Sequence, residues 1–252
     1  MRPLSVIIPT LDEADNIAGV IDSIQGVDEI LVVDSFSQDD TVLKAESLGA
    51  RVLQRKYTGP ADQKNWAIPQ ARNEWVLILD ADERVTPSLR AEIDQVLSQA
   101  EIPYDGFWIG RQNYFMGQQI HYSGWQGDAV IRLIRRDVCR YNEKQVHEEI
   151  ETAGVRIHRL KNKMEHYTFK NASHFLDKMR RYGEWSAQDY RTKTPTVGYL
   201  QLFWKPFFRF FKHYILKKGF LDGRVGLIIS VIMAWGVFLR YLYLIELRNK
   251  KS

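Results

Sequence analysis

Two aspartates, Asp80 and Asp82, follow directly on an apolar segment and are the side chains in this sequence best placed to bind a metal ion. The segment, residues 75–79, predicts a strand buried on both faces, as in a parallel sheet covered by helices. Because ionised carboxylates are costly to bury, their position at the carboxyl end of a core strand indicates a cleft. With Ala81 turned aside, both can face a hard divalent cation, Mg²⁺ or Mn²⁺, and the diphosphate that it bridges. An Asp-rich surface turn is the alternative interpretation.

The segments before this strand alternate between strands and helices. Strands are predicted over residues 4–9, 29–34 and 51–54, and helices begin near residues 17, 41 and 61. Three or four such units in about 85 residues indicate a parallel sheet with right-handed crossovers. No glycine-rich dinucleotide fingerprint and no Walker lysine motif follows these strands, which disfavours dinucleotide-binding and P-loop proteins.

After a helix over residues 86–100 the pattern changes to short strands. These are predicted at residues 107–109, 118–120, 129–134 and 155–157. Asn171 is placed to cap a further helix. Its apolar face would contain Phe175, Leu176, Met179, Tyr182 and Trp185. The predicted fold class is α/β, a doubly wound, mostly parallel sheet with a mixed second half.

The net charge of +4 conceals an uneven distribution. Residues 201–252 carry 10 of the 35 Lys and Arg but only 2 of the 31 Asp and Glu, so the rest of the chain is net acidic. This argues against nucleic-acid binding by the main domain and for an anionic partner at the carboxyl end. The single cysteine, Cys139, excludes an intramolecular disulfide and fits a reducing compartment. The chain passes from Met1 into its first strand without a signal peptide, so we expect a cytoplasmic location.

Four short motifs occur in a specific order. They are Val6-Ile7-Ile8-Pro9-Thr10 with Glu13 and Asn16, Val32-Val33-Asp34-Ser35 with Asp39-Asp40-Thr41, Gln63-Lys64-Asn65, and Asp80-Ala81-Asp82. Together they resemble the nucleotide-sugar glycosyltransferases of family 2, which have the GT-A fold. The resemblance covers roughly residues 3–190 and implies a glycosyltransferase domain over residues 1–192. Residues 193–252 are left as a C-terminal amphipathic helical region, rich in basic and aromatic side chains. Residues 63–67, 146–148 and 219–223 are similar to the bacterial branch that includes the lipopolysaccharide inner-core glucosyltransferase acting on heptose.

The resemblance implies a binding site for a UDP-sugar donor. Its members would be Pro9, Thr10, Glu13, Asp34, Lys64, Asp80, Ala81 and Asp82. Asp34 would accept the imide N–H of uracil, a role that suits an ionised carboxylate. Lys64 stands where the family often has Arg, so it would meet the diphosphate as a point charge. Asp80 would touch the ribose or the metal, and Asp82 would ligate the metal.

An inverting sugar transfer needs a carboxylate that takes the proton of the acceptor hydroxyl as the new bond forms. Residues 143–149 offer Glu148 and Glu149. Because a His-Glu pair recurs in the related branch, we favour Glu148 as the base and keep Glu149 as the alternative. In an extended segment the two point to opposite faces, so only one can serve. A charged surface loop is the noncatalytic interpretation.

His166 lies shortly before the helix that Asn171 caps. Some GT-A enzymes take a metal ligand from a histidine at this stage of the chain, so His166 is a candidate ligand together with Asp82. Imidazole suits Mn²⁺ better than Mg²⁺. A hydrogen-bonded structural histidine explains the residue equally well.

The C-terminal region is rich in aromatic and basic side chains. Residues 203–214 mix them densely, which is typical of a segment at a membrane interface. The longest apolar run, residues 225–239, has 15 residues, fewer than the ~20 that span a bilayer. We therefore favour a re-entrant or interfacial helix at the inner membrane surface. A homo-oligomer interface and a true span are the alternatives.

These features predict an inverting glycosyltransferase, peripheral on the cytoplasmic face of the bacterial inner membrane. It would move glucose from UDP-glucose to a lipid-linked saccharide, with lipopolysaccharide core heptose as the first candidate acceptor. Another cell-envelope polysaccharide or a polyprenyl phosphate is the alternative acceptor. A sugar-phosphate nucleotidyltransferase would need a basic, glycine-rich loop where Thr10-Leu11-Asp12-Glu13 stands. A noncatalytic scaffold would tolerate the loss of Asp82, which an enzyme would not.

Overall fold

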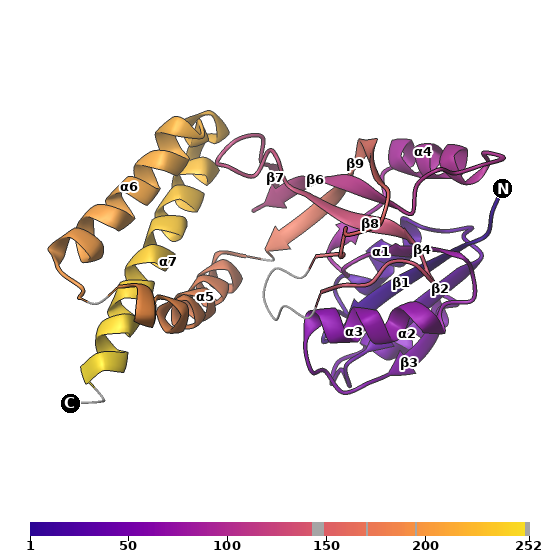
Figure 1. Cartoon of the computed structure of the whole chain (residues 1–252), viewed down its shortest axis with the longest axis horizontal. Coiled ribbons are helices and arrows are strands. Elements are labelled where there is room, and N and C mark those ends of the chain that lie inside the picture. Colours follow the sequence, from indigo (N-terminus) through magenta and orange to yellow (C-terminus); the bar gives the residue numbers. More distant parts are fainter. Residues whose placement is uncertain (143–148, 170, 195, 250–252) are drawn as a thin grey trace. The chain divides into compact units, whose positions relative to one another are not determined.

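The computed structural model describes residues 1–142, 149–169, 171–194 and 196–249. They form two compact units. Unit 1 comprises Met1–Arg111 and Asp128–His166, and unit 2 comprises Gln112–Gly127 and Tyr167–Ser252. Unit 1 contains the described residues of the predicted donor site, whereas unit 2 is mainly helical (Figure 1). The division into an enzymatic part, residues 1–192, and a C-terminal region stays a prediction about activity.

Four parallel strands form the first half of the sheet, in the order β3, β2, β1, β4 (Figure 1). Their bounds are β1 Leu4–Thr10, β2 Glu29–Asp34, β3 Arg51–Gln54 and β4 Trp75–Ile78. The helices between them are α1 Ile17–Asp22, α2 Thr41–Ser47 and α3 Pro60–Ala67, followed by the 3₁₀ turn η1 Ile68–Gln70. The α-helix α3 ends earlier than predicted because Pro69 lacks the N–H that the next helical hydrogen bond requires.

The second half of the sheet is joined by antiparallel pairs, where the change of pattern predicted a mixed half. After β4 the order is β8 Ala129–Arg135, β6 Gly106–Phe115, β9 Ile157–Phe169 and β5 Glu83–Arg84, with β7 Gln118–Gln119 paired to β6. The antiparallel pairs are those of β4 with β8, β8 with β6, β6 with β7 and β5 with β9. The helix α4 Pro87–Leu97 follows β5. Thr86 caps it by accepting the N–H of Leu89 at 3.2 Å. The strand predicted at residues 155–157 is the beginning of the longer β9.

Both faces of the sheet are buried. Along β1, Val6 and Ile8 pack into one apolar cluster and Ile7 into a second, and β4 alternates in the same way with Leu77 and Val76. Burying such a side chain contributes roughly 1.5–3 kcal/mol. The apolar faces leave the strand ends as the place where polar groups of β1, β2 and β4 can gather. The predicted doubly covered sheet is confirmed.

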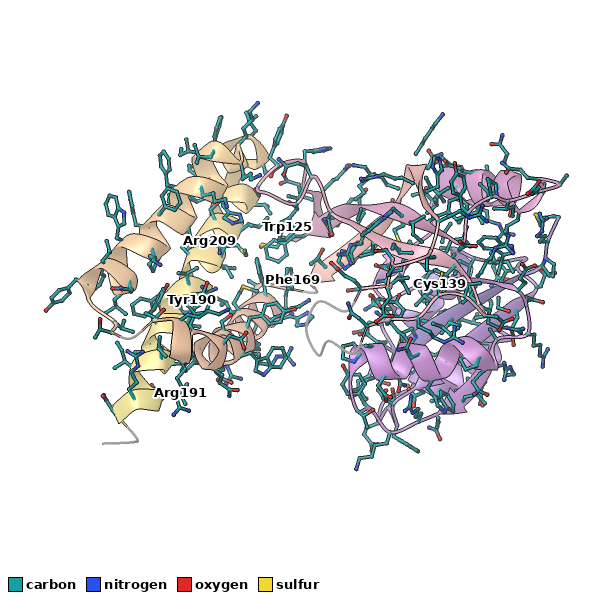
Figure 2. The ribbon with its side chains drawn as sticks, viewed as in Figure 1. Trp125, Cys139, Phe169, Tyr190, Arg191 and Arg209 are labelled. Atoms are coloured by element: carbon teal, nitrogen blue, oxygen red, sulfur yellow. The ribbon has the colours of Figure 1, made fainter. Side chains whose placement is uncertain are left out.

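The single cysteine lies inside unit 1 (Figure 2). Burial raises the pKa of the Cys139 thiol to about 11. The thiol therefore stays protonated at neutral pH, and we assign Cys139 a packing role.

Unit 2 is built around two long helices. Its helical elements are α5 Ala172–Lys193, η2 Leu200–Trp204, α6 Lys205–Phe211, η3 Lys212–Leu216, η4 Gly219–Asp222 and α7 Gly223–Asn249. Asn171 caps α5, as predicted, by accepting the N–H of His174 at 2.9 Å. Near this end, Trp125 and Phe169 pack in one cluster with Phe175 (Figure 2).

The face by which α5 packs on α7 differs in part from the prediction. Phe175 and Met179 are buried, but Leu176 and Trp185 are 41% and 46% exposed, so their assignment to the buried face was wrong. The buried side chains follow a spacing of four residues, and Gly183 lies on the same line. A Cβ at Gly183 would lie 3.0 Å from Leu239 Cβ, which shows how closely the two helices approach.

The helix α7 extends beyond the predicted apolar run. The helical segment Gly219–Asn249 has 31 residues, and its most apolar window has a mean hydropathy of 2.0. Arg240 lies within the helix, and its guanidinium lies over the Tyr190 ring, 4.5 Å from the centroid. Among the described residues this is the helix able to cross a membrane by length and composition, a property that core helices of soluble proteins share. Its length therefore does not exclude a span.

Candidate active site

The carboxyl ends of β1 and β2 meet, and Asp34 is the acceptor that joins them. Thr10 and Asp34 are register partners, and the Thr10 hydroxyl donates to Asp34 Oδ1 at 3.1 Å. Ser37 donates through its N–H at 2.9 Å and through its hydroxyl, and the Gln54 amide donates at 3.3 Å. Asp34 is fully buried, and these four donors match the number of hydrogen bonds that a carboxylate accepts. A uracil imide would have to replace one of them.

The loop after β1 is fastened to the loop after β2. The N–H of Asp12 donates to Ser37 Oγ at 2.8 Å, and the N–H of Glu13 donates to Thr41 Oγ1 at 2.8 Å. The Glu13 carboxylate accepts the Asn16 side-chain amide at 2.7 Å at the entrance to α1. These bonds hold Glu13 on the same rim as the ends of β1 and β2, where the prediction placed it.

Asp80 lies between two cations at the end of β4. It pairs with Lys64 Nζ at 3.2 Å and with Arg132 Nη2. Burial opposes ionisation of Asp80, but Arg132 and Lys64 outweigh it and hold the pKa of this carboxyl well below its usual range. Two cations already contact its oxygens, and the contact of Asp80 with the ribose or the metal stays a prediction. The predicted contact of Lys64 with a diphosphate would compete with the same ion pair.

Glu83 is the buried acid at the centre of these ion pairs and was not predicted from the sequence. Its side chain is fully buried and accepts Arg132 Nη2 at 2.9 Å and Arg111 Nη1 at 3.4 Å. Glu83 Oε2 also accepts the N–H of Asp80 at 3.0 Å, which fixes the turn after β4. A signal was available, since Arg132 interrupts an otherwise apolar strand and a cation there needs a buried partner.

Asp82 faces His166 across the pairing of β5 with β9. His166 stands opposite Glu83 in that register, and Asp82 Oδ2 lies 3.5 Å from His166 Nε2. A divalent ion bound at roughly 2.0–2.2 Å from each atom fits this separation. The Asp82 side chain is 30% exposed, so the pair is open to solvent on that side. The structure thus brings together the two residues that were predicted as metal ligands.

A metal at this pair would need ligands from outside the described chain. No group of three or more His, Cys, Asp or Glu side chains suited to a metal occurs among the residues that the structure describes. Asp82 and His166 would leave the remaining positions to water and to a substrate oxygen. Sites for Mg²⁺ and Mn²⁺ that bind substrate phosphates commonly have this incomplete protein shell.

Ala81 and Pro9 are the two apolar residues of the predicted donor site, and they can affect only its shape. Ala81 is buried, as expected for the residue turned away from the pair, and its carbonyl accepts Arg84 Nη1 at 2.7 Å. Pro9 is half-buried next to Val33 of β2. Neither side chain offers a polar atom, so any role in donor binding is one of contact.

Besides Trp75 Nε1 at the start of β4, three buried polar atoms of unit 1 have no hydrogen-bond partner within the described ranges. They are Gln63 Oε1, Arg132 Nε and the Tyr141 hydroxyl. The Gln63 amide bonds to Ser35 Oγ at 3.2 Å, next to Asp34. Lys64 Nζ lies 5.3 Å from the centroid of the Tyr141 ring. An unpaired buried polar atom costs about 1–3 kcal/mol, so a polar ligand at this edge would gain from bonding to these atoms.

The predicted base is described only in part. Glu148 lies outside the described residues. Glu149 is exposed, and its backbone is tied to Asn142, whose N–H donates to the Glu149 carbonyl at 2.9 Å. The choice between Glu148 and Glu149 stays a prediction.

Comparisons with known proteins agree with the predicted family. Residues 5–219 match glycosyl transferase family 2. An uncharacterized glycosyltransferase of Rickettsia typhi is 27% identical over 99% of this chain and 89% of its own length. The lipopolysaccharide core biosynthesis glycosyltransferase LpsC of Rhizobium meliloti is 25% identical over 95% of this chain and 93% of its own length.

Solved structures are similar to a smaller part of the chain. Mannosyl-3-phosphoglycerate synthase from Rubrobacter xylanophilus is 29% identical over 44% of this chain and 41% of its own, with a TM-score of 0.39. Glucosyl-3-phosphoglycerate synthase from Mycobacterium tuberculosis, solved with Mn²⁺, UDP and glucosyl-3-phosphoglycerate, is 26% identical over 46% of this chain and 45% of its own, with a TM-score of 0.36. TM-scores this low do not by themselves establish a shared fold.

The family match covers most of the chain, including both halves of the sheet. With the sheet described above, it confirms the predicted α/β GT-A fold class and the prediction of an enzyme that uses a nucleotide sugar. This protein belongs to glycosyl transferase family 2.

Proposed function

We propose that the protein is an inverting enzyme that transfers glucose from UDP-glucose to a lipid-linked saccharide, with lipopolysaccharide core heptose as the acceptor. Family membership supports sugar transfer. The similarity to LpsC over nearly the whole of both chains supports a lipopolysaccharide core acceptor. The basic and aromatic C-terminal region supports a peripheral location on the cytoplasmic face of the bacterial inner membrane, where such an acceptor would be reached.

The observation that carries the proposal is the Asp82–His166 pair at the end of the parallel strands. Asp82 and His166 would hold a divalent cation, Mg²⁺ or Mn²⁺, and the imidazole ligand favours Mn²⁺. When bound, this ion supplies positive charge that stabilises the diphosphate leaving group. Lys64 and Arg132 place two further cations at the same edge, where Asp80 fixes their positions.

Other residues of the chain would bind the nucleoside and remove the proton of the acceptor. The rim of Thr10, Glu13 and Asp34 would bind the nucleoside. Glu148, or Glu149 in its place, would take the proton of the acceptor hydroxyl as that oxygen bonds to the anomeric carbon. One displacement inverts the configuration at that carbon, so an α-linked UDP-sugar gives a β-linked product.

Two alternatives to this function differ from it in the acceptor substrate. Another cell-envelope polysaccharide or a polyprenyl phosphate would replace the lipopolysaccharide core as acceptor without a change in the donor site. A homo-oligomer formed through the C-terminal region is compatible with each of these acceptors.

The test is a turnover assay on the purified full-length protein. UDP-glucose, UDP-galactose, UDP-N-acetylglucosamine and GDP-mannose are each incubated with Mn²⁺ or Mg²⁺ and with heptose-terminated lipopolysaccharide core, truncated core or polyprenyl phosphate. We expect release of UDP only with UDP-glucose and the heptose-terminated core, and a mass increase of the core by one hexose. Transfer to polyprenyl phosphate instead would correct the acceptor. Absence of nucleotide release from every donor and acceptor pair would overturn the proposal.

A further inference from the structure

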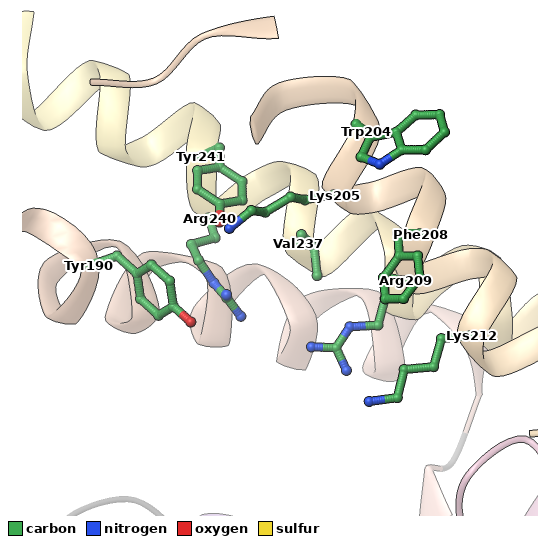
Figure 3. A pocket seen from close by; sticks show the side chains of 9 residues that line it. All are labelled: Tyr190, Trp204, Lys205, Phe208, Arg209, Lys212, Val237, Arg240 and Tyr241. Carbon is green, nitrogen blue, oxygen red and sulfur yellow. The ribbon is translucent and has the colours of Figure 1, made fainter. Parts of the chain in front are cut away.

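Unit 2 contains a cavity that the transfer reaction does not use. Its volume is about 500 Å³, and it is formed by α5, η2, α6, η3 and α7. Four of its lining residues are cations: Lys205, Arg209, Lys212 and Arg240. The others are aromatic or apolar: Tyr190, Trp204, Phe208, Val237 and Tyr241 (Figure 3). None of the lining residues is an acid.

The four cations of this pocket lack acidic partners in the described part of the chain. Within the described ranges, none of them has a carboxylate within ion-pair distance. Arg240 lies over the Tyr190 ring at 4.5 Å, and Lys205 lies 5.8 Å from the centroid of Tyr241. Arg209 Nη1 lies 3.4 Å from His213 Nε2, which carries no negative charge. Ring faces offset a full positive charge only in part. The pocket therefore keeps a net positive charge that a bound anion would neutralise.

Arg209 and Arg240 show most clearly that the positive charge of the pocket is not fully compensated. Figure 3 shows the guanidinium groups of Arg209 and Arg240 directed toward one another. Burial, together with the charge of Arg240, lowers the pKa of Arg209. Arg240 Nε is buried and has no hydrogen-bond partner in the part of the chain that is described. A tetrahedral oxyanion placed between the two would receive donors from both guanidinium forks and relieve their repulsion.

The surroundings of the pocket are apolar and exposed, which selects the kind of anion. Trp204 and Phe208 line the pocket and are 59% and 51% exposed. Phe203 and Phe207, on the adjoining turns, are 59% and 56% exposed. Exposed rings in such density, next to cations, are typical of a surface at the level of lipid headgroups. A free phosphate ion would use the cations but leave these rings in water.

We propose that the pocket between α5, α6 and α7 binds the phosphate monoester headgroup of a lipid. The phosphate oxygens would lie between Arg209 and Arg240, with Lys205 and Lys212 at the sides, and the acyl chains would leave along Trp204 and Phe208. The pocket would thereby hold unit 2 on a phospholipid surface at a defined site. This inference does not depend on which sugar the enzyme transfers, so either can fail without the other.

The experiment measures binding of the full-length protein to two sets of phosphatidylcholine vesicles. One contains phosphatidic acid and the other contains oleate at equal surface charge, so only the first adds phosphate monoesters. The readout is the ratio of the two affinities, because a loss of general electrostatic attraction lowers both equally. We expect the wild type to prefer phosphatidic acid by about tenfold or more, as charge-assisted hydrogen bonds allow. Equal affinity for the two vesicles would overturn the proposal.

Variants test whether the preference for phosphatidic acid depends on the residues of the pocket. Arg240→Gln, and separately Lys205→Gln combined with Lys212→Gln, should reduce the ratio toward one. Arg224→Gln is the matched control, since Arg224 lies exposed on α7 and does not line the pocket. It should weaken binding to both vesicles and leave the ratio unchanged. Circular dichroism checks the fold, and because Lys205 and Lys212 are exposed, the lysine variant decides the outcome if Arg240→Gln unfolds. A ratio reduced equally by Arg224→Gln would contradict the assigned site.

Soluble competitors separate a lipid from free phosphate. Dihexanoyl phosphatidic acid, kept below its micelle concentration, should displace the protein from phosphatidic acid vesicles at much lower concentration than inorganic phosphate. Displacement at equal concentrations would show that the apolar rim contributes nothing, and would replace the lipid by a free anion as the ligand.

Discussion

Asp82 Oδ2 lies 3.5 Å from His166 Nε2, and the two residues come from different halves of the sheet. Asp82 follows the last parallel strand, β4, and His166 lies on β9 of the antiparallel half. A site assembled from both halves forms only when the sheet is complete. This arrangement joins the predicted nucleotide-binding edge to the part of the chain that precedes the helical unit.

Replacing His166 with glutamine tests whether its imidazole is a metal ligand. The change removes the nitrogen ligand that favours Mn²⁺, so turnover with Mn²⁺ should fall by about tenfold or more while turnover with Mg²⁺ falls less. The measurement is the ratio of the two rates. His158→Gln is the control, because His158 is exposed and stacks on Tyr104. An equal loss with both metals would indicate a structural histidine.

Arg132 should be important for stability as well as for the charge of the site. Replacing it with methionine leaves Glu83 buried with a weaker partner, which should cost about 3–5 kcal/mol of unfolding free energy. Arg72→Met is the control, since the Arg72 side chain is 71% exposed and its pair with Glu29 is long, at 3.5 Å. Its loss should cost about 1 kcal/mol or less. Urea unfolding followed by circular dichroism measures both, and equal costs would contradict the role of the buried network.

Glu29, at the start of β2, should contribute to acid sensitivity. Burial raises the pKa of its carboxyl, but the N–H of Arg72, the Ser5 hydroxyl and Arg51 outweigh this and lower the pKa below the ordinary 4.5. Because the folded pKa is below the unfolded one, the stabilisation is complete above about pH 4.5 and is lost as the pH falls through the folded pKa.

The variant Glu29→Gln should therefore be less stable at neutral pH and lose less stability on acidification. Unfolding free energies measured from neutral pH to below about pH 4.5 provide the comparison. Glu46→Gln serves as the control because Glu46 is exposed on α2. If Glu29→Gln follows the same pH curve as the wild type, Glu29 does not couple folding to protonation.

The crowded hydrogen bonding of Asp34 allows a test of uracil binding. If Asp34 accepts the uracil imide, Asp34→Asn should weaken UDP binding by about tenfold or more. Gln54→Ala removes the longest of the four bonds to Asp34, so it should leave UDP affinity unchanged or improve it. Calorimetric titration with UDP measures both variants. Unaltered UDP affinity in Asp34→Asn would show that Asp34 serves only to join the strand ends.

Much of the fold was predictable because local pattern and tertiary environment agree. Runs such as residues 75–79 are apolar at every position, which only a strand covered on both faces explains. Aspartates at the ends of such strands must then lie at one edge, so Asp34, Asp80 and Asp82 were assigned to the correct region before any distance was known. Asn171 was identified by its capping chemistry.

The rest depends on pairings that the sequence does not encode locally. Arg132 reaches Asp80 and Glu83 across about 50 positions of chain, and no periodicity reports such a contact. These contacts give Asp80 an ion-pair role that was not predicted, beside its predicted contact with the ribose or the metal. The helix α7 is longer than the apolar run 225–239, because Arg240 continues the helix and packs on Tyr190 inside unit 2.

The most direct test of the metal-dependent donor site is calorimetric binding of UDP with and without Mn²⁺. The proteins compared are the wild type, Asp82→Asn and the control Asp137→Asn, whose side chain is 68% exposed in a surface ion pair. We predict that the wild type and the control bind UDP tightly only with Mn²⁺, and that Asp82→Asn loses about 100-fold of that affinity. UDP binding that is independent of Mn²⁺, or equal in all three proteins, would contradict the account.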